Sequence, residues 1–392
     1  MSVITKPISE VVEVNPRMPA DIACDLKLAV DFIPMAQLSE QGYVIPNGSR
    51  QLGEVIKGYT YFENGDVLVA KITPCMENGK AAYVNNLPHQ IGFGSTEFHV
   101  LRPRDCVYGR YLFYMIWNSE FRDEAEGNMT GSAGQKRVPK SFFDRFEIPL
   151  PPLSEQKRIA DILDKADSIR RKRQETVTVA EGFVSALFME MFASHHSAHS
   201  DTVKVMSFDD AISDFIDYRG KTPCKSTSGV PLVTAKVVKG GRILPPDEFI
   251  PDGDYDAWMR RGLPLRGDVL FTTEAPLGEV AQVADERIAL AQRVLLMRGK
   301  KGVLNNTFLR LAIKTPFVWN QIQRRSTGST VRGIRQKELR QVTLPVPSIA
   351  EQEQFERIAQ RQEQSIEVLR TSATHADLLF NSLVQRAFKR EL

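Results

Sequence analysis

Hydrophobic and polar positions follow a helical period in two long stretches of the chain. After Pro152, apolar residues recur at close to heptad spacing, with charged residues on the other faces, and the same pattern returns after Ser348. A lone helix would expose such a stripe, so we predict two long helices that pack against each other. The predicted stripes are Leu153, Ile159, Ile162, Ala166, Ile169, Ala180, Phe183 and Leu187, and then Phe355, Ile358, Leu369, Ala376, Leu379 and Leu383.

Each predicted helix has a marked start. Ser348 and Glu351 form the S-x-x-E pattern of a capping box. In the first stretch Pro152 takes the cap position, and the prolines there exclude a helix that enters from upstream. Polar residues near Arg173 and Gln362 interrupt the two stripes close to their middles.

The two helices belong to a repeat that covers the chain. VDFIPMAQLSEQG from Val30 corresponds to VPLVTAKVVKGG from Val230, and FENGDVLVAKITP corresponds to PLRGDVLFTTEAP, which ends at Pro276. TGSAGQKRV from Thr130 then matches TGSTVRGIR from Thr327, ahead of the two proline-rich segments. The offset stays near 200 residues throughout, so we interpret the chain as a tandem duplication.

Each half has the pattern of a mixed α/β domain. Runs rich in β-branched residues lie between Gly, Pro and Asn, which is typical of strands and turns. Residues 109–125 and 306–325 have helical spacing, and Pro316 should start or kink a helix. We predict an α/β (α+β) fold with two similar domains separated by the long helices. The predicted parts are 1–147 (first recognition domain), 148–200 (first helix and linker), 201–343 (second recognition domain) and 344–392 (second helix).

Composition is that of a globular protein without a membrane span. Of the 392 residues, 42% are hydrophobic and 25% charged, and no apolar run approaches the roughly 18 residues that a membrane span needs. The N-terminus has no basic region followed by an apolar one, so it does not resemble a secretory signal. We expect a cytoplasmic protein.

Cysteines and histidines give no metal-binding pattern. Cys24, Cys75, Cys106 and Cys224 stand far apart, so neither a zinc site nor a disulfide framework is predicted, and we expect buried or half-buried thiols. Three of the six histidines, His195, His196 and His199, lie in the polar stretch SHHSAHSD. No Cys or carboxylate pair completes a ligand set there, so we interpret this stretch as a linker and predict no metal.

Signatures of catalysis are missing. RGKTP, from Arg219, contains G-K-T but lacks the earlier glycine of a phosphate-binding loop. No dinucleotide-binding glycine motif, nucleophile elbow, zinc-protease motif or amino-methyltransferase motif occurs. These absences favour a binding protein over an enzyme.

Basic residues gather at matching places in the two halves. Net charge is only +3, from 51 basic and 48 acidic residues, so a nucleic-acid surface requires local clustering. Between Arg324 and Arg340 there are six basic residues and one acid, threaded by T-G-S-T, and the first half has GSAGQKR followed by Lys140. Small residues let backbone amides approach phosphates, while arginines reach phosphates or guanine. The candidate DNA-binding residues are Ser132, Gly134, Gln135, Lys136, Arg137, Lys140, Lys221, Lys236, Lys239, Thr327, Ser329, Thr330, Arg332, Gly333 and Arg335.

These motifs resemble the specificity subunit of type I DNA restriction-modification systems. IPLPPLSEQKRIADILDKAD from Ile148 is similar to the segment that follows each target recognition domain of that family. DYRGKTP, GVPLVTAKVVKGGRI, GDVLFTTEAP and T-G-S-T resemble the second recognition domain. The first half has no counterpart of the Arg-Gly-Lys-Thr-Pro segment.

The resemblance implies an architecture and a set of partners. It implies two recognition domains with a pseudo-twofold relation on an antiparallel coiled coil, each recognising one part of a split, asymmetric target in double-stranded DNA. Two methylation subunits and two restriction subunits are the implied partners, and S-adenosylmethionine, ATP and Mg are expected only on those partners. The helix residues expected to dock them are Glu155, Gln156, Ile159, Ile162, Ile169, Glu351, Gln352, Phe355, Ile358 and Leu369.

Two alternatives remain open from the sequence. One is a self-contained DNA methyltransferase or nuclease that shares such recognition domains, although its catalytic signatures would have to be present. The other is a coiled-coil scaffold without DNA binding, in which the basic loops are incidental. Affinity for DNA at varied salt separates the scaffold from a protein that binds phosphates, because phosphate binding weakens steeply as salt rises.

Overall fold

The computed structural model describes residues 4–45, 48–132, 134–192, 203–218, 220, 222–285, 287–329, 331–389 and 391–392. The chain forms two compact units. Unit 1 comprises Met1–Gln174 and Thr371–Leu392, and unit 2 comprises Glu175–Arg370. Each long helix therefore contributes one part to each unit.

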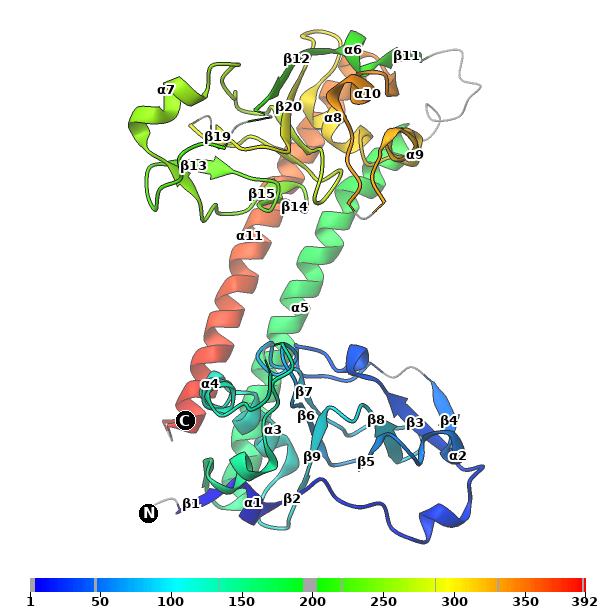
Figure 1. Cartoon of the computed structure of the whole chain (residues 1–392), viewed down its shortest axis with the longest axis vertical. Coiled ribbons are helices and arrows are strands. Elements are labelled where there is room, and N and C mark those ends of the chain that lie inside the picture. Colours follow the sequence, from blue (N-terminus) through cyan, green and yellow to red (C-terminus); the bar gives the residue numbers. More distant parts are fainter. Residues whose placement is uncertain are drawn as a thin grey trace. The chain divides into compact units, whose positions relative to one another are not determined.

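Unit 1 contains two four-stranded sheets (Figure 1). The first has the strand order β2-β9-β6-β7, and the second has the order β4-β3-β8-β5 with β3 parallel to β8. A separate pair, β1 with β10, joins the two ends of the domain. The strands are β1 Ile4–Pro7, β2 Val12–Val14, β3 Ala29–Ile33, β4 Ser49–Gln51, β5 Thr60–Glu63, β6 Val67–Ala70, β7 Ala81–Tyr83, β8 Ile91–Gly94, β9 Phe98–Pro103 and β10 Glu147–Leu150. The helices are α1 Ile8–Val11, α2 Leu52–Val55, α3 Gly109–Trp117 and α4 Ser119–Gly127.

Unit 2 repeats the main sheet and the closing strand pair of this topology, whereas its second sheet has three strands and β14 pairs separately with β15. Its four-stranded sheet has the order β12-β20-β17-β18, its second sheet has β13 parallel to β19 with β16 at the edge, and β11 pairs with β21. The strands are β11 Lys204–Ser207, β12 Ile212–Asp217, β13 Val230–Val233, β14 Val238–Lys239, β15 Arg242–Ile243, β16 Phe249–Ile250, β17 Val269–Thr272, β18 Val280–Gln282, β19 Ala289–Leu290, β20 Val294–Gly299 and β21 Thr343–Val346. The helices are α6 Phe208–Ala211, α7 Tyr255–Trp258, α8 Asn306–Ala312, α9 Pro316–Arg325 and α10 Gln336–Arg340. The two similar α/β domains predicted from the repeat are confirmed.

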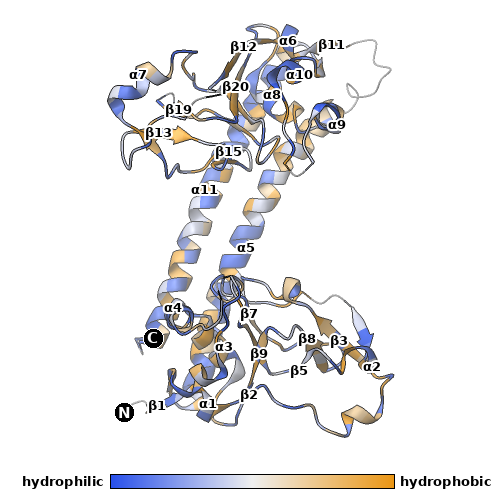
Figure 2. Ribbon diagram, in the orientation of Figure 1, coloured by the Kyte–Doolittle hydropathy of each residue, from blue (hydrophilic) through white to orange (hydrophobic). Residues whose placement is uncertain are grey.

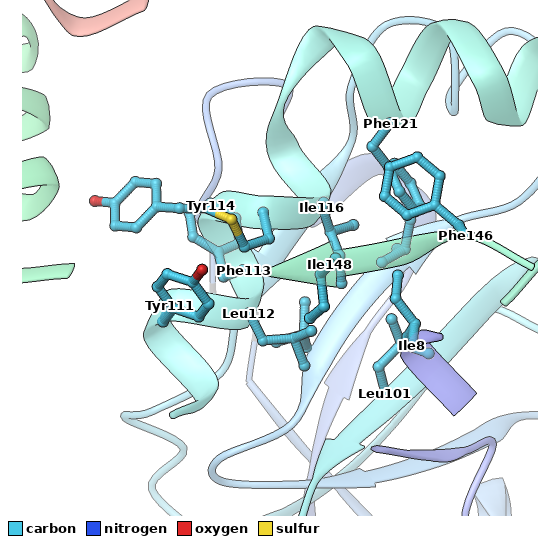
Figure 3. Close-up of a cluster of buried hydrophobic side chains, with 14 of the residues drawn as sticks. Ile8, Leu101, Tyr111, Leu112, Phe113, Tyr114, Ile116, Phe121, Phe146 and Ile148 are labelled. Carbon is cyan, nitrogen blue, oxygen red and sulfur yellow. The ribbon is translucent and has the colours of Figure 1, made fainter. Parts of the chain in front are cut away.

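Helix α3 carries the main core of unit 1. Tyr111, Leu112 and Phe113 are fully buried, because one side of the helix meets the sheet and the other meets the long helix α5. Figure 3 shows these side chains beside Leu101 of β9 and Ile148 of β10. The core thus ties the sheet, the closing strand pair and the long helix into one unit.

The helical stretch predicted at 109–125 is interrupted at Asn118. Asn118 has extended backbone angles, and its side chain accepts a hydrogen bond from the amide of Glu120 at 3.2 Å. An Asn side chain at this place caps a new helix instead of continuing the old one. The second stretch also divides, and α9 begins at Pro316 with Thr315 as its cap, as predicted.

The long helices are α5, Leu153–Phe192, and α11, Ile349–Phe388, each of 40 residues. In unit 1 the first part of α5 shares a core with the last part of α11, through Leu163 and Val384. In unit 2 the order is reversed, and the rings of Phe188 and Phe355 lie 5.3 Å apart. The helices therefore run antiparallel, as expected, and both alternate hydrophobic and hydrophilic bands (Figure 2).

The buried stripes differ from the predicted ones at several positions. Leu153, Ile169, Phe183 and Leu379 are exposed, although they were assigned to the stripes. Each long helix packs against the domains as well as against the other helix. The spacing of apolar residues within one helix therefore does not show which of its faces is buried. The buried apolar positions are Ile159, Ala160, Leu163, Ala166, Val177, Val184, Phe188 and Phe192 in α5, and Phe355, Ala359, Ile366, Ala373, Phe380, Val384 and Ala387 in α11.

The predicted capping box at the start of α11 is confirmed. The backbone amide of Ser348 donates to Oε2 of Glu351 at 2.9 Å, and the amide of Glu351 donates to Oγ of Ser348 at 3.4 Å.

The expectation for the cysteines was wrong for three of them. Cys24, Cys106 and Cys224 are exposed, and only Cys75 is half-buried.

Candidate nucleic-acid interface

Two loops of the same design carry most of the predicted DNA-binding residues. Loop 1 is Thr130–Arg137 and loop 2 is Thr327–Gly333. In each loop the first and last residues exchange two backbone hydrogen bonds, of 3.0 and 2.8 Å in loop 1 and 2.9 Å twice in loop 2. The matching T-G-S segments therefore mark the same turn in both units.

The end of each loop is attached to the main sheet. After loop 1, the amide of Val138 donates to the carbonyl of Lys71 at 2.9 Å, and the amide of Lys71 donates to the carbonyl of Glu97, also at 2.9 Å. After loop 2, Ile334 and Thr273 make the corresponding bonds, with Arg293 in the place of Glu97. Each loop is thus attached at the ends of the two central strands of its sheet, where β6 and β17 end and β9 and β20 begin.

A glycine in each T-G-S segment is required by the turn. Gly131 has φ +125° and Gly328 has φ +109°, in the region that favours glycine. An added Cβ would lie 2.9 Å from the carbonyl oxygen of Gln135 in loop 1, and 2.1 Å from that of Val331 in loop 2. Both glycines therefore form the loops.

Loop 1 exposes most of its predicted residues. Lys136 lies in a surface recess that is also lined by Glu77, Asp123 and Glu126, so acidic groups balance part of its charge. Ala133 lies outside the described residues. The exposed predicted residues are Ser132, Gly134, Gln135 and Lys136 in the loop, and Lys140 three residues after it.

Arg137 is bound within its own unit. Its guanidinium donates to both carboxylate oxygens of Glu97, at 2.9 and 2.8 Å, and to the carbonyl of Gln135 at 3.1 Å. The hydrogen bonds from Arg137 hold the pKa of Glu97 below its usual value. Sequence reasoning assigned Arg137 to DNA, whereas this geometry favours a role in holding the base of loop 1.

His99 lies buried beneath loop 1. Its Nε2 is 2.8 Å from the carbonyl oxygen of Val138, and its ring packs edge-on against Phe143. Burial lowers the pKa of His99, which favours the neutral form of the ring. It supports the loop from below and is not available to a ligand.

Loop 2 and the segment directly after it expose two cations without a charge partner among the described residues, Arg332 in the loop and Arg335 at the start of α10. Neither Arg332 nor Arg335 has a side-chain ion pair or hydrogen bond to another residue in the described part of unit 2. Gly333 is half-buried and lies close to Glu274, whose Cγ would be 3.3 Å from an added Cβ. Thr330 lies outside the described residues. Thr327, Ser329, Arg332 and Arg335 are exposed.

The remaining predicted cations lie elsewhere in unit 2. Lys239 is exposed in β14, which pairs with β15, and Lys236 is exposed just before it. Lys221 and Arg219 of the RGKTP segment lie outside the described residues, as do His195, His196 and His199.

Two glutamines predicted to dock other subunits are buried at the helix starts. Gln156 accepts from the amide of Tyr108 at 2.8 Å and donates to the carbonyls of Cys106 at 3.0 Å and Pro151 at 2.8 Å. Gln352 makes the same three bonds, with Asn305, Val303 and Pro347 at 2.8, 3.0 and 2.9 Å. The expectation is corrected for both, because their hydrogen bonds attach each helix to its own domain.

Replacing Gln156 is expected to destabilise the chain. Gln156→Ala removes a fully buried side chain and takes the hydrogen-bond partner from the amide of Tyr108 and the carbonyl of Cys106, which should lower the free energy of unfolding by about 2–4 kcal/mol. Glu155→Ala is the matched control, since it removes only an exposed pair with Arg158 and should cost less than about 1 kcal/mol. Urea unfolding compares them, and equal losses would contradict this role for Gln156.

The other predicted docking residues divide by burial. Ile159 and Phe355 are buried in the cores of their own units, so they too are unavailable to a partner. Glu155, Ile162, Ile358 and Leu369 are half-buried, whereas Ile169 and Glu351 are exposed. The sequence analysis did not predict that α5 and α11 carry large apolar side chains at the surface. It assumed that apolar residues at helical spacing pack between the two helices. The exposed side chains include Val179, Phe183, Met189, Val368, Leu378 and Leu379.

The described residues contain neither a metal-binding cluster nor a membrane-spanning helix. No cluster of three or more His, Cys, Asp or Glu side chains there has the arrangement of a metal site. None of the helices among them has the length and apolar character to cross a membrane.

Comparisons with known proteins agree with the repeat. A family model described as the type I restriction modification DNA specificity domain matches residues 4–179 and 237–372. The Escherichia coli EcoAI specificity subunit is 44% identical over 158 residues, which are 39% of this chain and 26% of that protein. The EcoKI specificity subunit of Escherichia coli K12 is 22% identical over 339 residues, 80% of this chain and 72% of that one. The chain spans about a quarter of the length of the EcoAI and EcoEI relatives, 26% in each case.

Solved structures show the same fold. A chain from a study of the assembly and conformational transition of a type I R-M system has a TM-score of 0.56 at 18% identity, over 99% of this chain and 98% of that one. The S subunit from M. genitalium has a TM-score of 0.53 at 13% identity, over 99% and 96%. With two matched domains that cover most of its length, this chain belongs to the family of type I restriction modification DNA specificity domains.

Proposed function

We propose that this chain is the DNA specificity subunit of a type I restriction-modification enzyme. Each unit recognises one part of a split, asymmetric target in double-stranded DNA. The observation that carries the proposal is the repeated loop design, in which loop 1 and loop 2 have the same backbone closure and the same attachment to the main sheet. Both present small polar residues and cations to solvent.

The two loops would contact DNA through different residues. Arg332 in loop 2 and Arg335 just after it have the exposure and the free donors needed for phosphates or guanine edges. Lys136 in loop 1 and Lys140 just after it supply the charge in unit 1, and Gln135 is suited to hydrogen bonding with a base. Ser132, Thr327 and Ser329 are suited to phosphate contacts. Lys236 and Lys239 belong to the proposal as further cations of unit 2, together with Lys221, Thr330 and the loop glycines Gly134 and Gly333.

The long helices would bind the partner subunits. Phe183 and Leu379 are 50% and 57% exposed, and they occupy matching places in the repeat, 196 residues apart. Large apolar side chains that are exposed at equivalent positions of the two helices are suited to binding two copies of one partner. We propose two methylation subunits there, with two restriction subunits completing the enzyme. S-adenosylmethionine, ATP and Mg would be used by those partners in the cytoplasm, and this chain would contribute recognition without catalysis.

Salt dependence tests the DNA-binding part of the proposal. Affinity of the full chain for a random-sequence duplex should fall steeply as salt is raised from about 50 to 200 mM, because bound cations release counterions from the phosphates. Binding that is absent, or unaffected by salt, would contradict the proposal.

Arg332→Ala should weaken DNA binding by about 1–3 kcal/mol if its guanidinium meets a base edge, and it should relax one half of the target only. The matched control is Lys301→Ala. Lys301 is an exposed cation after the far end of β20, away from loop 2, and its loss should leave the selectivity unchanged. Fluorescence anisotropy with duplexes that differ in one half-site measures both variants. Equal losses in both half-sites for Arg332→Ala would exclude this placement.

A further inference from the structure

The base of loop 2 contains an arginine that the sequence did not single out. The chain segments that close loop 1 and loop 2 have the same pattern of backbone hydrogen bonds. This pattern makes five residues of unit 1 equivalent to five residues of unit 2. The pairs of equivalent residues are Lys71 and Thr273, Ile72 and Glu274, Glu97 and Arg293, Arg137 and Gly333, and Val138 and Ile334.

Charge is arranged differently at these equivalent positions. In unit 1, Glu97 and Arg137 form a two-pronged ion pair of 2.8 and 2.9 Å that occupies both groups. In unit 2 the arginine stands on the β20 side, and glycine replaces Arg137. Within the described residues Arg293 has one ion pair, a single 3.7 Å contact from its Nε to Oε2 of Glu274. The Arg293 side chain is 53% exposed and that of Glu274 42% exposed, so both polar ends are accessible at the loop base.

The backbone of Arg293 has an unusual conformation. Its φ is +70°, a value that glycine adopts readily and arginine does not. The carbonyl of Arg293 accepts from the amide of Thr273 at 2.9 Å and from its hydroxyl at 3.3 Å, which holds this geometry. A residue held in a sparsely populated region at a ligand-facing loop is a reason to ask what its side chain does.

The neighbours of Arg293 come from the other predicted DNA-binding segments. Gln292 donates from Nε2 to the hydroxyl of Thr222, within the RGKTP segment, at 3.2 Å. Thr273 joins Arg293 to Ile334 at the end of loop 2. Arg293 therefore lies where two separate motifs of unit 2 meet.

We infer that Arg293 and Glu274 together recognise one G·C base pair in the half-site of unit 2. This inference rests on the proposed function. An arginine donates to O6 and N7 of guanine, and a carboxylate accepts from N4 of cytosine, so adjacent Arg and Glu side chains complement the two bases of one pair. A phosphate at the same place would meet the carboxylate of Glu274, and the like charges would repel. The neutral base edge is therefore the better match.

Arg293→Gly provides the sharpest test. Glycine fits the φ of this position, so the variant should fold at least as well as the wild type. Selection from a duplex library with randomised positions first defines the target of the wild-type full chain. Against the selected duplex, Arg293→Gly should bind about 5- to 150-fold more weakly and lose the preference for G·C at one position. Glu274→Gln should relax the same position, and the control Lys301→Ala should relax none.

The outcomes separate this inference from the proposed function. A wild-type chain that selects no sequence overturns both. If the wild type selects a target but Arg293→Gly retains every preference, only the present inference is overturned. The same holds if Arg293→Gly weakens all duplexes equally, which would indicate a phosphate contact, or if Glu274→Gln relaxes a different base pair.

Discussion

Exchange of the second domain is expected to change one half of the DNA target and leave the other half intact. Residues 204–346 would be replaced by the corresponding segment of a relative with a different target. The topology of unit 2 is complete within this segment, from β11 to β21. Its contacts with α11 include hydrogen bonds to Gln352 and Glu356, an ion pair with Glu363 and packing against Phe355. Methylation or binding-site mapping of the hybrid measures the two half-sites separately.

The boundaries of the exchange follow from the structure. A segment that stops at residue 343 would divide β21 from its partner β11, whose register runs from Lys204 with Val346 to Ser207 with Thr343. Including both strands keeps that pair from one source. The reciprocal exchange of residues 4–150, from β1 to β10, is the control and should change the opposite half. A hybrid in which both half-sites change would refute independent recognition by the two units.

Lengthening both long helices by four residues is expected to lengthen the unrecognised spacer of the target by one base pair. Four residues add about 6 Å and about 40° to an α-helix, whereas one DNA base pair adds about 3.4 Å and roughly 35°. The insertions belong after Gln174 and after Arg370, where the two units divide. These places are 196 residues apart, the spacing of the repeat, and replace the sequence-based choice of Arg173 and Gln362.

A seven-residue insertion at the same places is the matched control. It adds about 10 Å, close to three base pairs, but rotates the helix by only about −20° while the DNA rotates by roughly 100°. Binding should therefore be impaired. Mapping of the bound sites decides the matter, and an active four-residue variant with an unchanged spacer would exclude the helices as the element that sets the spacing.

The fold could be predicted because the sequence repeats itself at every level. The strand pattern, the T-G-S turns and the helix starts recur in one order, so each half supports the interpretation of the other. The capping box at Ser348 and the start of α9 at Pro316 are local features, and they were predicted correctly. Asn118 interrupts a helix because its side chain caps the next one, a choice that apolar spacing does not reveal.

Individual site residues were less predictable, because their roles depend on partners far away in the chain. Arg137 and Arg332 have similar sequence surroundings, yet Arg137 is bound to Glu97, 40 residues earlier, and Arg332 is exposed. Gln156 and Gln352 were placed correctly on the helices, but their burial depends on carbonyl groups about 50 residues away. Arg293 had no motif of its own, and only the comparison of the two loop bases identifies it.

Selection of bound duplexes from a fully randomised library, with the full-length chain, tests the central claim most directly. Two units with separate DNA-binding loops predict a motif of two specific parts divided by a spacer of fixed length in which all bases occur equally. One continuous motif, or enrichment of no sequence at any salt concentration, would contradict the account.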